Sequence, residues 1–309
     1  MTPEVRDGAQ CHQLPGQCEY DTDGHHHLGR LSRGLCLARH PDVSLPLAAL
    51  IVVGAGALAG LAFVLLDRAA AKPFVPESAR GGPTLIVSGA LFAVVLAFVT
   101  LAAFQTFNSA KAGAQTEAAA LLDMARTAAV FPPSQRDRLR ADLTCYGRAV
   151  VDQEWPAMRN GHASPLVDHW IGAYRAEFER LELRSPREQL SFQDLLNLAN
   201  VRTAGRQQRL SQDTPSVPTP LWLAIVLGGC IVVALQLSLA GSGVRVHALL
   251  VAGLATLIAA GLLIIYVLDH PYQTHTGGIH PGAMRRALVM MGNLEPSLRL
   301  SCSESGQPG

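Results

Sequence analysis

Four long stretches without Asp, Glu, Lys or Arg constrain the fold of this 309-residue sequence more than any other feature. They lie between residues 42 and 67, 80 and 111, 213 and 245, and 245 and 269. A helix needs about 20 consecutive apolar residues to cross about 30 Å of hydrocarbon. The sequence therefore predicts four membrane-spanning helices, over residues 45–66, 84–107, 221–240 and 246–268.

The composition is typical of a membrane protein, so the lipid bilayer is the first partner that we expect. Only 16% of the residues are charged and 49% are hydrophobic, whereas soluble domains carry about 25% charged residues. The net charge is +1 and the basic residues are scattered, which excludes an electrostatic nucleic-acid surface. A cleaved signal peptide is an alternative for the first stretch, because three alanines follow it at 69–71.

The distribution of basic residues predicts the orientation. Positively charged residues in short flanks stay on the cytoplasmic side of the membrane. The basic residues expected on one side are Arg30, Arg33, Arg39, Lys111, Arg126, Arg202, Arg206, Arg209, Arg285 and Arg286. The opposite side carries only Arg68, Lys72, Arg80 and Arg245. We therefore expect a multi-pass protein of the plasma (inner) membrane, with both termini and the central domain in the cytoplasm.

The expected fold is an all-α integral membrane protein with two transmembrane hairpins, at 43–107 and 214–270, and a cytoplasmic helical domain at 108–213. Residues 1–42 are expected to be a disordered tail, and 271–309 a C-terminal tail. In the central domain, Ser134 with Asp137 predicts one helix start, and Ser164 a second. Ser185 with Glu188 predicts a third, because both capping-box residues are present.

Glycines in the first span allow two interpretations. Residues 51–60 match the glycine pattern of a dinucleotide-binding turn, but the short, proline-broken segment 72–77 cannot supply the second strand that such a fold needs. We favour the alternative, in which Gly56 and Gly60 let another membrane helix approach closely.

Several motifs resemble those of the bacterial bestrophin-like proteins, a family defined by a domain of unknown function. They are Glu117-Ala118-Ala119-Ala120-Leu121, Tyr146, Glu154-Trp155-Pro156, Asn200-Val201-Arg202-Thr203-Ala204-Gly205-Arg206, Pro220-Leu221-Trp222 and Asp269-His270-Pro271-Tyr272. The resemblance implies a four-span membrane protein and, through its distant similarity to bestrophins, a homo-oligomeric channel for chloride or another small anion.

The pore lining implied by the resemblance lies on the second span, at Val94, Phe98 and Ala102, with Gln105 below. Apolar constrictions can gate a channel by dewetting, but the same spacing also suits ordinary helix packing. A second functional class remains open, a membrane-anchored scaffold or signalling protein that binds partners through its cytoplasmic helices.

Signals for an enzyme, a metal site or a cofactor are weak, and we expect none of the three. The sequence has no Walker loop, Gly-x-Ser-x-Gly elbow or His-Glu-x-x-His helix. The acidic residues that could suggest a carboxylate site are Asp152, Glu154, Glu177, Glu179 and Glu182. We interpret them as solvated helix faces interleaved with arginines. Asp269 and His270 could bind an ion, although Pro271 more simply ends the fourth span.

The cysteines are expected to be free thiols, because disulfides are rare in the cytoplasm. Cys11, Cys18 and Cys36 accompany several histidines in the first forty residues, but their spacing does not match a zinc finger.

Overall fold

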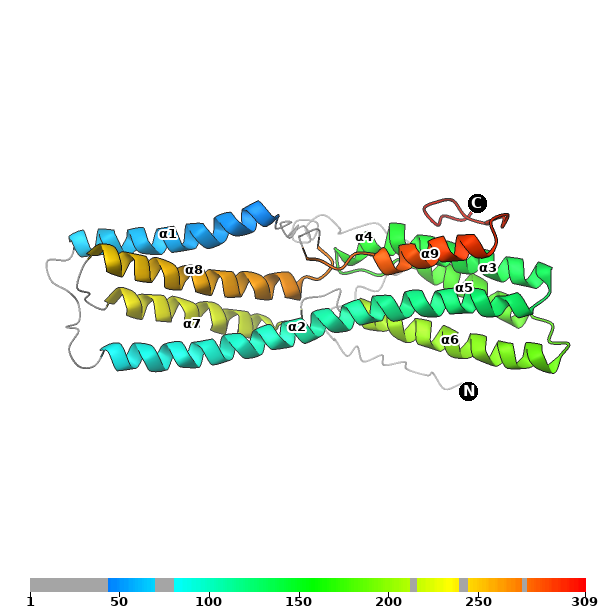
Figure 1. The fold of residues 1–309 in the computed structure, drawn as a ribbon, viewed down its shortest axis with the longest axis horizontal. Helices are drawn as coiled ribbons and strands as arrows, with labels where there is room; N and C mark the ends of the chain where they lie inside the picture. The colour runs from blue at the N-terminus through cyan, green and yellow to red at the C-terminus, as the bar shows by residue number, and fades with distance from the viewer. Residues whose placement is uncertain (1–43, 70–80, 212–215, 239–243, 274–276) are drawn as a thin grey trace, which may run out of the picture. The chain divides into compact units, whose positions relative to one another are not determined.

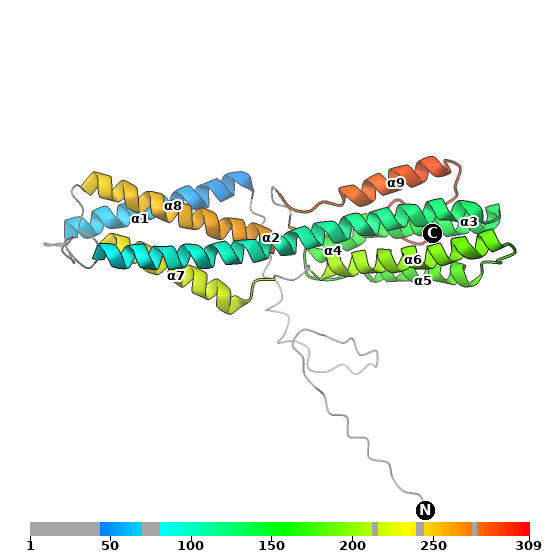
Figure 2. The ribbon, with the colours of Figure 1, turned by 60° about the horizontal axis from the view of Figure 1, so that its bottom comes forward.

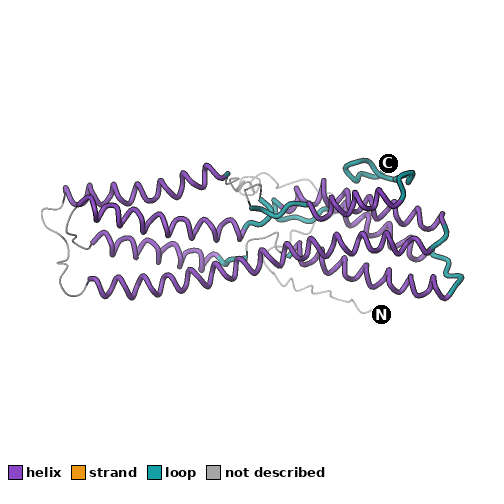
Figure 3. The backbone as a smooth tube through the Cα atoms, viewed as in Figure 1, coloured by secondary structure: helices purple, strands orange, loops and turns teal. Residues whose placement is uncertain are grey.

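The computed structural model describes residues 44–69, 81–211, 216–238, 244–273 and 277–309, and within them it contains helices joined by loops and no β-strand (Figure 3). The cysteine- and histidine-rich tail lies outside these residues, as does the segment 239–243 between the third and fourth apolar stretches. The prediction of an all-α fold is confirmed for the described chain.

Four helices are long and apolar enough to cross a membrane, as the sequence predicts. They are α1 (Leu45–Ala69), α2 (Gly81–Thr127), α7 (Thr219–Ser238) and α8 (Val244–Asp269). Helix α2 is about twice as long as a span requires and continues without a break beyond the apolar segment (Figure 1). Its first half therefore packs with the other apolar helices, and its second half packs with the helices that are not apolar enough to span a membrane.

The membrane helices pack in an order that differs from their order in the sequence. Helix α1 packs mainly on α8, and α2 packs on both α7 and α8. Gly56 and Gly60 lie on the face of α1 that meets α8, where a Cβ atom on Gly56 would stand 2.9 Å from the carbonyl oxygen of Ala252.

The remaining helices pack around the second half of α2. They are the 3₁₀ turn η1 (Ala128–Val130), α3 (Pro133–Ala149), the π-helical turn η2 (Val150–Glu154), α4 (Trp155–Met158), α5 (Pro165–Glu179), α6 (Pro186–Leu210) and α9 (Gly282–Leu294). Figures 1 and 2 both show α6 and α9 on opposite sides of α2. Their shared core includes Leu121, Leu139, Leu143 and Tyr174, which are fully buried.

The helix starts in this region follow the sequence with one exception. Ser185 and Glu188 form the reciprocal capping box that the sequence predicts. The cap predicted at Ser134 is wrong, because α3 begins one residue earlier at Pro133 and its start has no side-chain cap. Proline suits the first helical position, since it lacks the N–H that would otherwise remain unsatisfied.

Two findings concern the C-terminal segment after α8. It contains helix α9, which packs against α2 and α3. The expectation of free thiols is wrong for Cys145 and Cys302, which form a disulfide that joins α3 to the C-terminal segment. Cys230, on α7, is a free cysteine.

Candidate functional site

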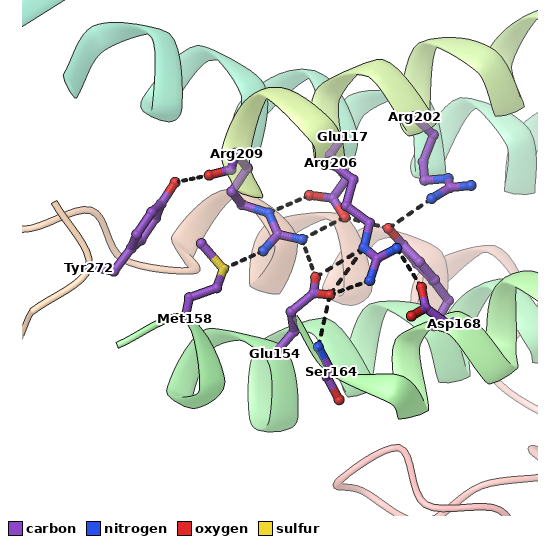
Figure 4. Close-up of polar contacts among 10 residues, drawn as sticks. Glu117, Glu154, Met158, Ser164, Asp168, Arg202, Arg206, Arg209 and Tyr272 are labelled. Atoms are coloured by element: carbon purple, nitrogen blue, oxygen red, sulfur yellow. Dashed lines mark hydrogen bonds and ion pairs between the residues drawn. The ribbon is translucent and has the colours of Figure 1, made fainter. Parts of the chain in front are cut away.

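A cluster of charged side chains lies buried where α2 and α6 come close together. Gly113 and Gly205 permit this approach, because a Cβ atom on Gly205 would stand 2.7 Å from the backbone nitrogen of Glu117. The side chains of Glu117 on α2 and Arg209 on α6 meet next to this contact (Figure 4).

The centre of the cluster is the guanidinium of Arg209, which is 0% exposed. Its Nε and Nη2 atoms donate to the two carboxylate oxygens of Glu117 over 2.6 and 3.0 Å. The same Nη2 also donates to Glu154, at the end of η2. The Arg209 guanidinium lies 5.1 Å from the centre of the Trp155 ring. The backbone carbonyl of Arg209 accepts a hydrogen bond from the hydroxyl of Tyr272. One arginine therefore links α2, η2, α4 and the segment after α8.

Two further arginines, one and two turns earlier on α6, extend the cluster. Arg206 donates to Glu154 over 3.1 Å and to Asp168 on α5 over 2.6 Å. Arg202 donates to the hydroxyls of Tyr146 and Tyr174. These three arginines at positions i, i+4 and i+7 form one face of the helix.

The charges of the cluster balance, with three carboxylates, Glu117, Glu154 and Asp168, against Arg202, Arg206 and Arg209. Burial alone would raise the pKa of the Glu154 carboxyl, but Arg209 and Arg206 outweigh burial and hold this pKa below its ordinary value. The carboxylate of Glu154 is therefore stabilised in its ionised form, and both Glu117 and Glu154 are engaged by arginine. Such an arrangement locks helices together and offers no free base for catalysis.

The expectation of solvated carboxylates is wrong for Glu154 and Glu177. Glu154 is 0% exposed, and Glu177 is buried with Arg138 and Arg180 as its ion-pair partners. The π-helical turn η2 explains the first error, because it inserts an extra residue and rotates Glu154 inward relative to a regular α-helix. Arg209 was missed as a site residue, although its seven-residue spacing from Arg202 was a signal.

The other motif residues serve different parts of the structure. Asn200 is exposed on α6 and Pro156 is exposed on α4, next to the buried Trp155. Asp269 ends α8 and accepts hydrogen bonds from the backbone nitrogens of Ser216 and Val217 and from the indole of Trp222. It thus fastens the start of α7 to the end of α8. His270 stacks on Tyr266, and the buried Pro271 lies two residues after the last residue of α8.

The pore-lining candidates lie on one exposed face of α2. Val94 and Phe98 are 53% and 69% exposed, and Ala102 and Gln105 are also exposed. The opposite face of the same helix, represented by Val99 and Ala103, is buried against α7 and α8. The structure thus brings the four candidates onto one surface, away from the charge cluster.

Among the described residues, no group of three or more His, Cys, Asp or Glu side chains is placed to hold a metal ion. The family model of the bestrophin-like domain matches residues 49–275, well over half of the sequence. The chain belongs to the bestrophin-like family. No curated protein sequence matches it closely enough to add a relative.

Solved structures of bacterial bestrophin homologues share the fold of this bestrophin-like protein. A homologue from Klebsiella pneumoniae with one point substitution superposes with a TM-score of 0.62 at 13% identity, over 79% of this chain and 98% of the other. Another structure of a homologue from this organism gives a TM-score of 0.58 at 15% identity, over 86% and 100% of the two chains. At these identities the comparison shows the fold alone.

Proposed function

We propose that this bestrophin-like protein assembles from several copies into a channel that conducts chloride or another small anion across the plasma membrane. In this proposal the exposed face of α2 lines the ion path. Both termini and the helices around the charge cluster lie in the cytoplasm, as the distribution of basic residues favours.

The observation that carries the proposal is the polar end of the exposed α2 face. Gln105 lies on the same stripe as Val94 and Phe98, and its amide forms no hydrogen bond within the described part of the chain. Asn108, one turn further on, is also exposed. An unsatisfied amide in hydrocarbon costs several kcal/mol, whereas water or a neighbouring copy would satisfy it. This face is therefore better suited to a water-filled path or a subunit contact than to lipid.

The charge cluster supports the proposal as a mechanical anchor. Helix α2 runs unbroken from the exposed face at Phe98 to the buried carboxylate of Glu117. The ion pair with Arg209 fixes the far end of this helix to α6. A pore lined by α2 would thereby be held at a fixed tilt by the helices outside the membrane.

The test is chloride efflux from proteoliposomes that contain the purified protein. Phe98→Ala removes the largest side chain of the stripe, and we expect it to raise efflux about tenfold if dewetting limits conduction. The matched control is Leu249→Ala on α8, a residue 73% exposed on another membrane helix, which should leave efflux unchanged. Folded protein that passes no more chloride than empty liposomes would contradict the proposal.

The scaffold alternative also has one observation in its favour. Leu190, Leu196 and Val201 on α6 are 64%, 42% and 45% exposed, outside the membrane spans. A partner protein that covered these side chains would gain free energy in proportion to the apolar area it buries. A monomer that conducts nothing but retains a partner through these residues would favour the scaffold, whereas their burial between copies would favour the channel.

A further inference from the structure

The disulfide between Cys145 and Cys302 closes a loop between residues 157 positions apart in the sequence. Cys145 lies on α3 and is 0% exposed, within the core that also contains Tyr146. Cys302 lies in the segment after α9 and is half-buried. The bond thus attaches an outer segment to the interior of the helical domain.

The segment from Leu298 to Gly309, here called the C-terminal clamp, lies on α3 and α5. The indole of Trp170 on α5 donates to the carbonyl of Gly306 over 2.7 Å, and Arg148 on α3 donates to the carbonyl of Ser303 over 3.0 Å. Gly306 has a φ of +79°, and a Cβ atom there would stand 2.7 Å from the Cα atom of Ala149. Only glycine therefore fits at this contact.

The clamp has little else to hold it in place. Ser301, Ser303, Glu304 and Gln307 are exposed. Its apolar contacts with the core are made by the partly buried side chains of Leu300 and Cys302. A single hydrogen bond contributes only about 1 kcal/mol net, and the clamp has one buried bond, from Trp170, and one exposed bond, from Arg148. The disulfide is therefore the principal restraint on this segment.

We propose that Cys145 and Cys302 are a reversible thiol–disulfide site, and that its reduction releases the C-terminal clamp from α3 and α5. The inference rests on the cytoplasmic placement in the proposed function, since disulfides in that compartment are usually transient. The reductant that fits is a protein dithiol, because it delivers two electrons through one exposed thiolate.

The exposure of the two cysteines sets the direction of the exchange, because Cys145 is buried and Cys302 is half-buried. A thiolate of the dithiol attacks Sγ of Cys302, the Sγ–Sγ bond breaks, and Cys145 leaves as a thiolate that takes up a proton. The second thiol of the reductant then attacks the mixed disulfide. This step releases the thiol of Cys302 and leaves the reductant as its own disulfide, so that two electrons have passed to the pair.

The experiment follows both the bond and the clamp in the full-length protein. Cys11, Cys18, Cys36 and Cys230 are replaced by Ser, so that only the pair can react. In cells, acid quenching and a maleimide that adds mass count the free thiols before and after treatment with the thiol oxidant diamide. We expect two free thiols in resting cells and none after oxidation.

Hydrogen exchange on the purified protein then reports release of the clamp. We expect the amides of the C-terminal clamp to exchange about tenfold faster after reduction with dithiothreitol, while the amides of α3 keep their protection. Cys302→Ser should show the fast exchange under both conditions. Trp170→Phe is the matched control. It removes the hydrogen bond from Trp170 to the clamp but leaves the disulfide, so the exchange of the clamp should still respond to the reductant.

Two results would overturn the inference, and one of them also tests the topology. A pair that stays oxidised in resting cells is a permanent structural disulfide, and a clamp that remains protected after reduction is not released by it. Asn200→Cys, on the exposed face of α6, separates the causes. Suppose that one of these contrary results is obtained. If an impermeant maleimide then labels the new cysteine from outside the cell, the cytoplasmic placement is wrong as well. If the new cysteine stays unlabelled, the placement stands and only the redox inference is wrong.

Discussion

The two halves of α2 show how one helix meets two different solvents. In the first half, Phe98 is 69% exposed, and the helix buries only a narrow stripe against α7 and α8. In the second half, Glu117 is a charged residue that is 0% exposed. Hydropathy is sufficient to place the first half in the membrane, because a span requires only a long apolar run and no particular partner for each side chain. The second half depends on particular partners, above all Arg209.

The same contrast extends to the helices that surround α2. The four apolar helices contain spans of which 6–17% of the residues are buried within the chain. The helices around Glu117 share a continuous apolar core, beside which Glu117 and Glu154 are buried with their arginines. The membrane half can therefore tolerate many substitutions, whereas the other half has a few positions on which its packing depends.

The largest effect is expected from Arg209→Ala. This change leaves the carboxylates of Glu117 and Glu154 buried with one partner removed, which should lower the free energy of unfolding by about 3–5 kcal/mol. Chemical denaturation in detergent, followed by tryptophan fluorescence, measures the loss. Arg126→Ala is the control, because Arg126 and its partner Asp123 have side chains that are 55% and 50% exposed, and their ion pair should contribute less than about 1 kcal/mol. Equal losses for the two variants would break the contrast between buried and exposed charges.

An intermediate loss of stability is expected at the contact between α2 and α6, where the two backbones approach each other at Gly205. Gly205→Ala places a methyl group within 2.9 Å of backbone atoms of Glu117 and Gly113, and should destabilise the contact between α2 and α6 by about 1–3 kcal/mol. Gly172→Ala on α5 has nothing within 4 Å, so the better helix propensity of alanine should make it neutral or slightly stabilising. Thermal denaturation of both variants tests this pair.

The membrane half offers the same comparison in lipid. Gly56→Ala meets the backbone of Ala252 on α8, whereas Gly54→Ala has nothing within 4 Å. We expect Gly56→Ala alone to weaken the α1–α8 contact, measured by the temperature at which the detergent-solubilised protein loses its folded helices. A neutral Gly56→Ala would show that lipid-embedded helices shift more easily than α2 and α6.

The smallest effect concerns a carboxyl at the edge of the helical core. Burial, aided by Glu177, raises the pKa of the Asp142 carboxyl from 3.8 to about 6. The folded protein therefore keeps this proton up to about pH 6, while the unfolded chain loses it near 3.8, so the free energy of unfolding falls as pH rises between these values. Asp142→Asn should add only about 1 kcal/mol to the free energy of unfolding at pH 7, because solvent partly screens this half-buried carboxylate. Below about pH 4 the substitution should add nothing, since Asp142 is then protonated in both states. Unfolding curves at both pH values check the sign, and a variant that stabilises equally at both would contradict it.

The sequence predicted the helical fold, the four apolar helices and the capping box at Ser185 because these follow from local patterns. It also singled out Glu117, Tyr146, Arg202 and Arg206, which the structure brings into one cluster. The burial of Glu154 was not predictable in this way, because it depends on a π-helical turn and on arginines more than fifty residues away. The disulfide at Cys145 depends equally on a contact between distant segments.

The central claim is that the exposed stripe on α2 lines an ion path, and cysteine accessibility tests it most directly. Gln105→Cys in a background without other cysteines is reconstituted in a planar bilayer, and the chloride current is recorded while a water-soluble thiosulfonate reagent is added. Leu249→Cys on α8 is treated in parallel as the exposed position that should face lipid. We predict that the reagent blocks the current of Gln105→Cys and leaves that of Leu249→Cys unchanged. Block at neither position, or at both to the same extent, would contradict the claim.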